Sequence, residues 1–87
     1  MDLIKLHKIK EFANEQLKKW GLTGSYGNDW CMVWDTKAVR RYGQCRYRKQ
    51  EIGITKQLAN INSIEETKDV VLHEIAHALT GPGHGHD

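Results

Sequence analysis

The chain has little of what membrane-bound, secreted or disordered proteins are made of. It has two cysteines, one proline and a mean hydropathy of −0.65. No stretch approaches the ~20 apolar residues of a membrane-spanning helix, and charges interrupt the N-terminal residues where a secretory signal has a continuous apolar core. Cys31 and Cys45 are too few for a disulfide framework and too far apart for a zinc knuckle, so we expect both to be reduced packing residues. We therefore expect a cytoplasmic protein, or one associated with DNA in the nucleoid.

The size of the chain limits it to one small domain. A chain of 87 residues and 10.0 kDa buries only about 60% of its unfolded surface. We expect a single core domain over residues 1–87, either whole or truncated after its histidine-rich tail. Domains near this size often need a disulfide, a metal or a partner for stability. Charge is distributed unevenly along the chain. Residues 1–62 contain 12 Lys and Arg and 6 Asp and Glu, whereas residues 63–87 contain 1 Lys and 5 Asp and Glu. Four of the five histidines also lie in residues 63–87, so this part of the chain favours cation binding.

Hydrophobic periodicity predicts an α+β fold. Apolar residues from Leu3 to Trp20 recur with the spacing of one helix face, which predicts a helix that ends at Gly21. Residues 21–29 contain three glycines and predict a loop. Aromatic and β-branched residues then predict a small antiparallel sheet of about three strands, at residues 30–34, 42–49 and 51–55. A small core needs large side chains, so we expect it to bury the tryptophans Trp20, Trp30 and Trp34.

A second helix is predicted near the C-terminus. Residues 58–62 are expected to be a connector, after which Ser63 and Glu66 match a capping box. The helix should end before Pro82, because proline cannot continue it. We expect it to pack on the sheet through an apolar stripe that consists of Leu72, Ile75, Ala76 and Leu79.

This second helix carries the motif His-Glu-x-x-His. His73 and His77 are four residues apart and therefore lie one above the other on the same face, where both imidazoles can bind one ion. Glu74 lies beside them and can take a proton from the water that the metal activates. The pattern predicts a catalytic metal site. The alternative is a pair of histidines on an exposed face with no ion.

A catalytic zinc needs a third protein ligand and an open fourth position. Residues 81–87 contain a proline and glycines that allow the backbone to fold back, so the candidates for the third ligand are His84 and His86. The metzincin subclass is excluded, because Thr80 and Gly83 stand where its pattern needs Gly and His, and both methionines precede the helix.

Four segments together resemble the SprT-like zinc metallopeptidases: residues 41–48 (RYGQCRYR), 51–55 (EIGIT), 72–78 (LHEIAHA) and 83–87 (GHGHD). The resemblance covers roughly residues 20–87. It implies a minimal zincin fold with the active-site helix at the C-terminal end. It also implies one Zn²⁺ held by His73, His77 and His86, with His84 as the alternative third ligand, and Glu74 as the general base.

Basic residues cluster between Lys37 and Lys49 without an acid among them. Interleaved with Tyr42 and Tyr47, they suit a phosphate backbone and stacked bases, and the family resemblance implies DNA nearby. The candidate nucleic-acid contacts are Arg40, Arg41, Arg46, Arg48 and Lys49. The alternative is a solvated strand whose charges discourage edge pairing. Asp35 either orients a ligand histidine or caps a turn.

These patterns predict a zinc-dependent metallopeptidase that hydrolyses peptide bonds, with DNA-associated proteins among its candidate substrates. We expect a monomer that acts on a protein or peptide, with no membrane partner. Two alternatives remain. One is another small zinc peptidase of the ImmA/IrrE type, and the other is a catalytically inactive, zinc-stabilised DNA-binding or interaction module with four closed ligands.

Overall fold

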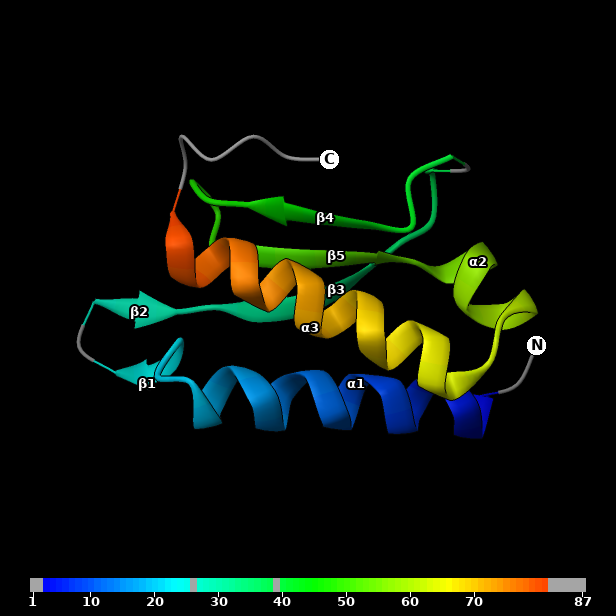
Figure 1. Cartoon of the computed structure of the whole chain (residues 1–87), viewed down its shortest axis with the longest axis horizontal. Coiled ribbons are helices and arrows are strands. Elements are labelled where there is room, and N and C mark those ends of the chain that lie inside the picture. Colours follow the sequence, from blue (N-terminus) through cyan, green and yellow to red (C-terminus); the bar gives the residue numbers. More distant parts are fainter. Residues whose placement is uncertain (1–2, 26, 39, 82–87) are drawn as a thin grey trace.

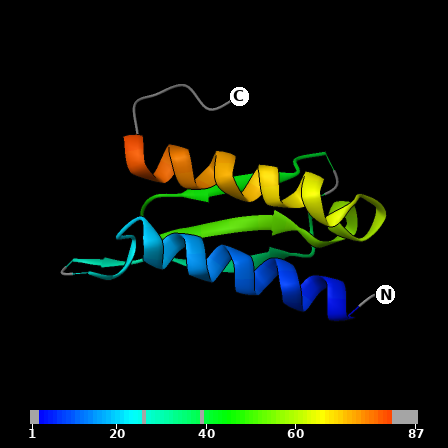
Figure 2. The same ribbon diagram turned by 60° about the horizontal axis from the view of Figure 1, so that its bottom comes forward.

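The computed structural model describes residues 3–25, 27–38 and 40–81, which fold into two long helices packed on a small sheet (Figure 1). Figure 2 shows the two long helices running side by side in the same direction. The elements in chain order are α1 (Leu3–Lys19), β1 (Thr23–Ser25), β2 (Asn28–Asp29), β3 (Cys31–Asp35), β4 (Gly43–Arg46), β5 (Glu51–Thr55), α2 (Lys56–Ile61) and α3 (Ile64–Thr80). The α+β prediction with a helix at each end is confirmed. No helix in these described ranges is long and apolar enough to cross a bilayer.

The main sheet has three strands, in the order β3-β5-β4. β4 and β5 form an antiparallel hairpin, but β3 pairs with β5 in parallel, so the expectation of an antiparallel sheet is wrong for this pair. Side-chain alternation has a period of two in either direction, and it therefore cannot reveal strand direction. The direction instead follows from the strand order. β5 lies between β3 and β4, and it runs antiparallel to β4 and parallel to β3.

Two segments differ from their predicted conformation. Residues 23–29, expected to be a loop, contain the antiparallel pair β1 and β2, with Gly24 and Gly27 in the left-handed region at φ 81°. Residues 58–62, expected to be a connector, are mostly part of α2, which buries Ala59 completely. In both segments tertiary packing and turn geometry outweigh the local composition.

The core lies between the sheet and the two long helices. α1 buries Leu6, Ile9, Ala13 and Leu17, and the sheet buries Met32, Ile52 and Ile54 against them. Of the tryptophans expected in the core, Trp30 is buried, Trp34 is half-buried and Trp20 is 51% exposed. Both cysteines are free thiols, but Cys31 is exposed and only Cys45 is a packing residue.

The predicted beginning and end of α3 are confirmed, but its buried face is not the predicted one. Ser63 Oγ accepts from the amide of Glu66, whose carboxylate accepts in turn from the amide of Ser63. The residues that α3 buries are Thr67, Val71, Glu74 and Ile75, whereas Leu72 and Leu79 are 40% and 47% exposed and Ala76 is exposed. At 100° per residue, the buried face is rotated by about 100° from the predicted stripe. This rotation brings Glu74 against the sheet.

Candidate metal centre

His73 and His77 lie one turn apart on α3, outside its buried face. Their Nε2 atoms are 3.1 Å apart, and the ring centroids are 4.6 Å apart with the rings nearly perpendicular. His73 is exposed and His77 is half-exposed. The two nitrogens therefore converge on a region that solvent can reach, at the border between the exposed and the buried face of the helix.

The separation of the two nitrogens fits a shared zinc ion. Two Zn–N bonds of about 2.0–2.1 Å at the tetrahedral angle place the nitrogens about 3.3–3.4 Å apart, close to the 3.1 Å observed. In the described ranges there is no cluster of three His, Cys, Asp or Glu side chains that could hold an ion. His84 and His86, the candidates for the third ligand, lie outside the described residues. The structure thus brings together the two helical members of the predicted ligand set.

Glu74 lies on the buried side of α3, directly after His73 and three residues before His77, and is only 2% exposed. It packs against Gly43 at the start of β4. A Cβ atom on Gly43 would lie 3.0 Å from Cγ and Oε2 of Glu74 and 2.8 Å from Cγ1 of Val70. Because Gly43 has no side chain, β4 can approach the carboxylate of Glu74 closely. Sequence reasoning assigned no role to Gly43, and its only signal was that glycine is unfavourable inside a strand without a reason.

The thiol of Cys45 and the phenol of Tyr47 lie near this carboxylate. Burial raises the pKa of Cys45 to about 11, with a hydrogen bond between the thiol and Tyr47 opposing this and the charge of Glu74 adding to it. Burial also raises the pKa of Tyr47, and Cys45 and Glu74 act in the same direction. Both groups are therefore neutral near pH 7. The surroundings of Glu74 on β4 are hydrogen-bonding but uncharged.

The two tyrosines that flank β4 contact α3. The hydroxyl of Tyr42 lies 2.6 Å from Oγ1 of Thr67, and the hydroxyl of Tyr47 donates to the carbonyl of His77 at 2.9 Å. Both rings pack against the core. Both tyrosines are half-buried and support the helix, and the stacking of nucleic-acid bases on their rings stays a prediction.

A cavity of about 310 Å³ lies along β4. Its lining residues are Arg41, Gln44, Cys45 and Tyr47. In the described part of the chain, β4 has a neighbouring strand on one side only, which is β5. The cavity thus borders the strand edge nearest to the candidate site.

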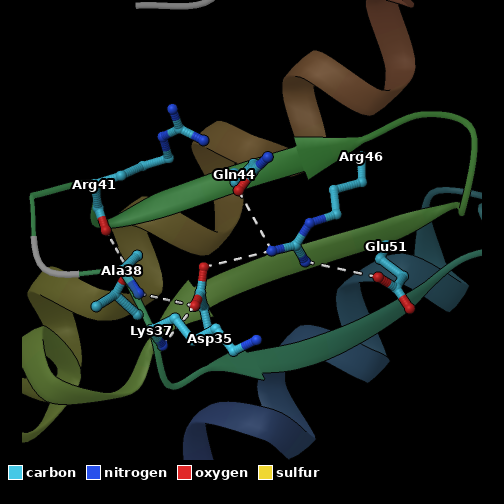
Figure 3. A network of polar contacts seen from close by, with 8 residues as sticks. Asp35, Lys37, Ala38, Arg41, Gln44, Arg46 and Glu51 are labelled. Carbon is cyan, nitrogen blue, oxygen red and sulfur yellow. Dashed lines mark hydrogen bonds and ion pairs between the residues drawn. The ribbon is translucent and has the colours of Figure 1, made fainter.

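The basic residues between Lys37 and Lys49 separate into two groups. Arg46 lies on the face of the sheet opposite α1 and α3, where its guanidinium is 3.4 Å from Asp35 and 3.6 Å from Glu51 (Figure 3). The exposed members are Lys37, Arg40, Arg41, Arg48 and Lys49. Figure 3 shows the guanidinium of Arg41 turned away from the Asp35–Arg46 pair. Nucleic-acid contact by the five predicted residues stays a prediction, which salt-dependent binding of a single-stranded oligonucleotide would test.

Asp35 caps a turn. Its Oδ1 accepts from the amides of Lys37 and Ala38 at 2.9 and 3.0 Å. These amide bonds, that of Ala38 first, lower the pKa of Asp35, and the nearby Arg46 contributes further. Of the two predicted roles, the structure therefore shows turn capping, together with an ion pair to Arg46.

The comparisons with known proteins give a family. A model of the SprT-like family matches residues 9–87. Comparison with curated proteins and with solved structures gave no match. The matched range includes all of α3, with its two histidines and Glu74, and the whole sheet. The chain therefore belongs to the SprT-like family.

Proposed function

We propose that this chain is a zinc-dependent peptidase whose metal site is on α3. The observation that carries the proposal is the 3.1 Å separation of the Nε2 atoms of His73 and His77, with Glu74 between them in sequence and packed against β4. Family membership supports the same conclusion. Proteins or peptides are the proposed substrates.

The proposed ligands are His73, His77 and one histidine of the tail, His86, with His84 as the alternative. When bound, zinc would polarise the scissile carbonyl and lower the pKa of a water molecule toward ~7. Two imidazoles one helical turn apart supply a rigid pair of nitrogens for this purpose, because the helix fixes their spacing. Such a zincin-type site leaves one coordination position open for the reaction.

Glu74 is the proposed general base. Its carboxylate would accept a proton from the attacking water and then donate that proton to the nitrogen of the leaving amine. Its burial against Gly43 restricts its rotamers. The base is thereby held beside both the histidine pair and the edge of β4.

The edge of β4 is the proposed platform for an extended substrate. The amide of Thr55 donates to the carbonyl of Tyr42, so alternation along the antiparallel pair turns the backbone groups of Gln44 and Arg46 toward β5. The N–H and C=O groups of Gly43 and Cys45 then point away from β5. A peptide strand that paired with them would lie along the cavity and beside Glu74.

Replacement of Glu74 by Gln tests the proposal. Turnover of an unstructured protein such as casein should fall by about 10²–10⁴-fold, because the amide cannot accept the proton. The zinc content of the purified variant, measured by metal analysis, should stay at one ion per chain, because Glu74 is not a proposed ligand. Glu65→Gln is the matched control, since Glu65 is exposed on the first turn of the same helix, and it should retain full turnover.

Two results would contradict the proposal. Full activity of Glu74→Gln would exclude Glu74 as the base. Zinc held by four protein ligands in X-ray absorption, without turnover by the wild-type chain, would instead support the alternative of a structural zinc module.

A further inference from the structure

Two tyrosines, one at each end of β4, form hydrogen bonds to two positions on α3 that are about as far apart as the tyrosines themselves. Tyr42 precedes the strand and reaches Thr67, and Tyr47 follows the strand and reaches the carbonyl of His77. Five residues of strand span about 17 Å, and ten residues of helix span about 15 Å. The strand and the helix therefore lie along each other with one tyrosine bond near each end.

The hydrogen bonds from Tyr42 and Tyr47 reach different parts of α3. Thr67 lies in the first half of α3, ten residues before His77, and its own hydroxyl also donates to the carbonyl of Ser63. The carbonyl of His77 lies in the last turn, where it also accepts from the amide of Gly81 at 2.9 Å and from Oγ1 of Thr80 at 3.2 Å. Of these three bonds in the described part of the chain, the one from Tyr47 ties the carbonyl to the sheet, whereas the other two come from residues at the end of the helix itself.

The ring of Tyr47 is itself well supported. It packs edge-on against the buried ring of Trp30, with centroids 6.0 Å apart, and contacts the core. The hydroxyl is therefore presented from a half-buried and restrained side chain. A free helix end frays, whereas this last turn is fixed to the end of β4.

We propose that Tyr47 is a positioning residue for His77, an inference that rests on the proposed metal site. Its hydroxyl fixes the last turn of α3 against β4. This sets the direction of the His77 imidazole relative to His73, and it sets where the chain leaves the helix at Gly81. Tyr47 acts through the backbone of His77 and touches neither metal nor substrate in this role.

Tyr47→Phe and Tyr42→Phe form a matched pair for the test. Each removes one hydroxyl and keeps the ring, and the carbonyl of His77 retains the amide of Gly81 as a donor. Zinc affinity is measured by competition with a chromophoric chelator, and ligand geometry by the visible absorption of the Co²⁺-substituted protein. Amide hydrogen exchange is followed in the metal-free protein.

Tyr47→Phe should weaken zinc binding by about 10–100-fold, as is typical when a group that orients a ligand is removed. The Co²⁺ bands should shift, and exchange should accelerate at Gly81 and in the last turn of α3. Tyr42→Phe should leave zinc affinity and the Co²⁺ bands unchanged, because Thr67 is far from the histidines.

Equal zinc affinity in the two variants would overturn the role of Tyr47, whether both lose affinity or neither does. Failure of the wild-type chain to bind zinc would overturn the proposed function and, with it, the positioning of a metal ligand. Hydrogen exchange separates the two failures, because it reports on the bond without metal. Unchanged protection at Gly81 in Tyr47→Phe would show that the hydroxyl does not hold the turn.

Discussion

The two faces of the three-stranded sheet differ in the surroundings of their charged side chains. On the face opposite α1 and α3, which no helix covers in the described part of the chain, Arg46 is bracketed by Asp35 and Glu51 (Figure 3). On the face covered by the helices, the carboxylate of Glu74 is buried beside a strand whose nearby groups, Cys45 and Tyr47, are neutral. The uncovered face thus carries its charges in ion pairs, whereas on the covered face Glu74 lies near a thiol and a phenol of β4.

Two glycines at neighbouring positions on β4 and β5 make this difference testable. Gly43 faces α3 and Gly53 lies beneath Arg46, and a Cβ on either would come within 2.8 Å of another atom. Gly43→Ala should lower the free energy of unfolding by about 1–3 kcal/mol, because the methyl group would meet packed atoms of Val70 and Glu74. Gly53→Ala should change it by no more than about 0.5 kcal/mol, because the guanidinium of Arg46 can swing aside. Urea denaturation of both variants measures the difference.

The two glycine variants also test the position of Glu74 in the candidate metal centre. Displacement of Glu74 by Gly43→Ala should reduce peptide hydrolysis as well as stability, whereas Gly53→Ala should retain wild-type turnover. Equal losses of stability in the two variants would show that the strand does not need a glycine to approach α3.

The difference between the faces also explains where sequence reasoning failed on α3. The residues Leu72, Ile75, Ala76 and Leu79 have the spacing of a buried stripe, but three of the four are exposed or nearly half-exposed. The helix buries Thr67 and Glu74 in their place. A polar threonine and a carboxylate do not count as core residues in a hydrophobic pattern. Their burial depends on Tyr42 and Gly43, which come from a distant part of the chain.

Other features followed directly from local chemistry. The capping box at Ser63 and Glu66, the end of α1 before Gly21, and three segments of β-branched and aromatic residues were all recognisable in the sequence. The convergence of His73 and His77 follows from helical spacing alone. Strand direction, the ion pairs of Arg46 and the bond from Tyr47 to His77 require tertiary contacts, and no local pattern encodes them.

The two cysteines offer a smaller test of the same comparison. Burial raises the pKa of Cys45 to about 11, from an ordinary value near 9. The unfolded chain therefore loses this proton at lower pH than the folded chain, and the contribution of Cys45 to stability, present below pH 9, is lost as the pH rises to about 11. The difference in unfolding free energy between wild type and Cys45→Ala should shrink over this interval. Cys31→Ala is the control, because Cys31 is exposed.

Alkylation of the folded protein gives an independent measurement. Iodoacetamide at pH 8 should modify Cys31 readily and Cys45 only after unfolding, since reactivity requires an accessible thiolate. Rapid labelling of both thiols would show that β4 is not held against α3 in solution.

The smallest expected effect concerns Asp35 and Arg46 on the uncovered face. The pKa of Asp35 is lowered first by the amides of Ala38 and Lys37, and only then by Arg46. The stability that this carboxylate contributes is present above its ordinary pKa of 3.8 and is lost as the pH falls through its lowered value. In Arg46→Met, the pKa of Asp35, followed by NMR titration, should therefore stay below its ordinary value. The cost in stability should be about 1 kcal/mol, the upper end for surface ion pairs, because the side chains of Arg46 and Asp35 are only 28% and 14% exposed. A return of the Asp35 pKa to its ordinary value would show that the ion pair, and not the turn, holds this carboxylate in its charged form.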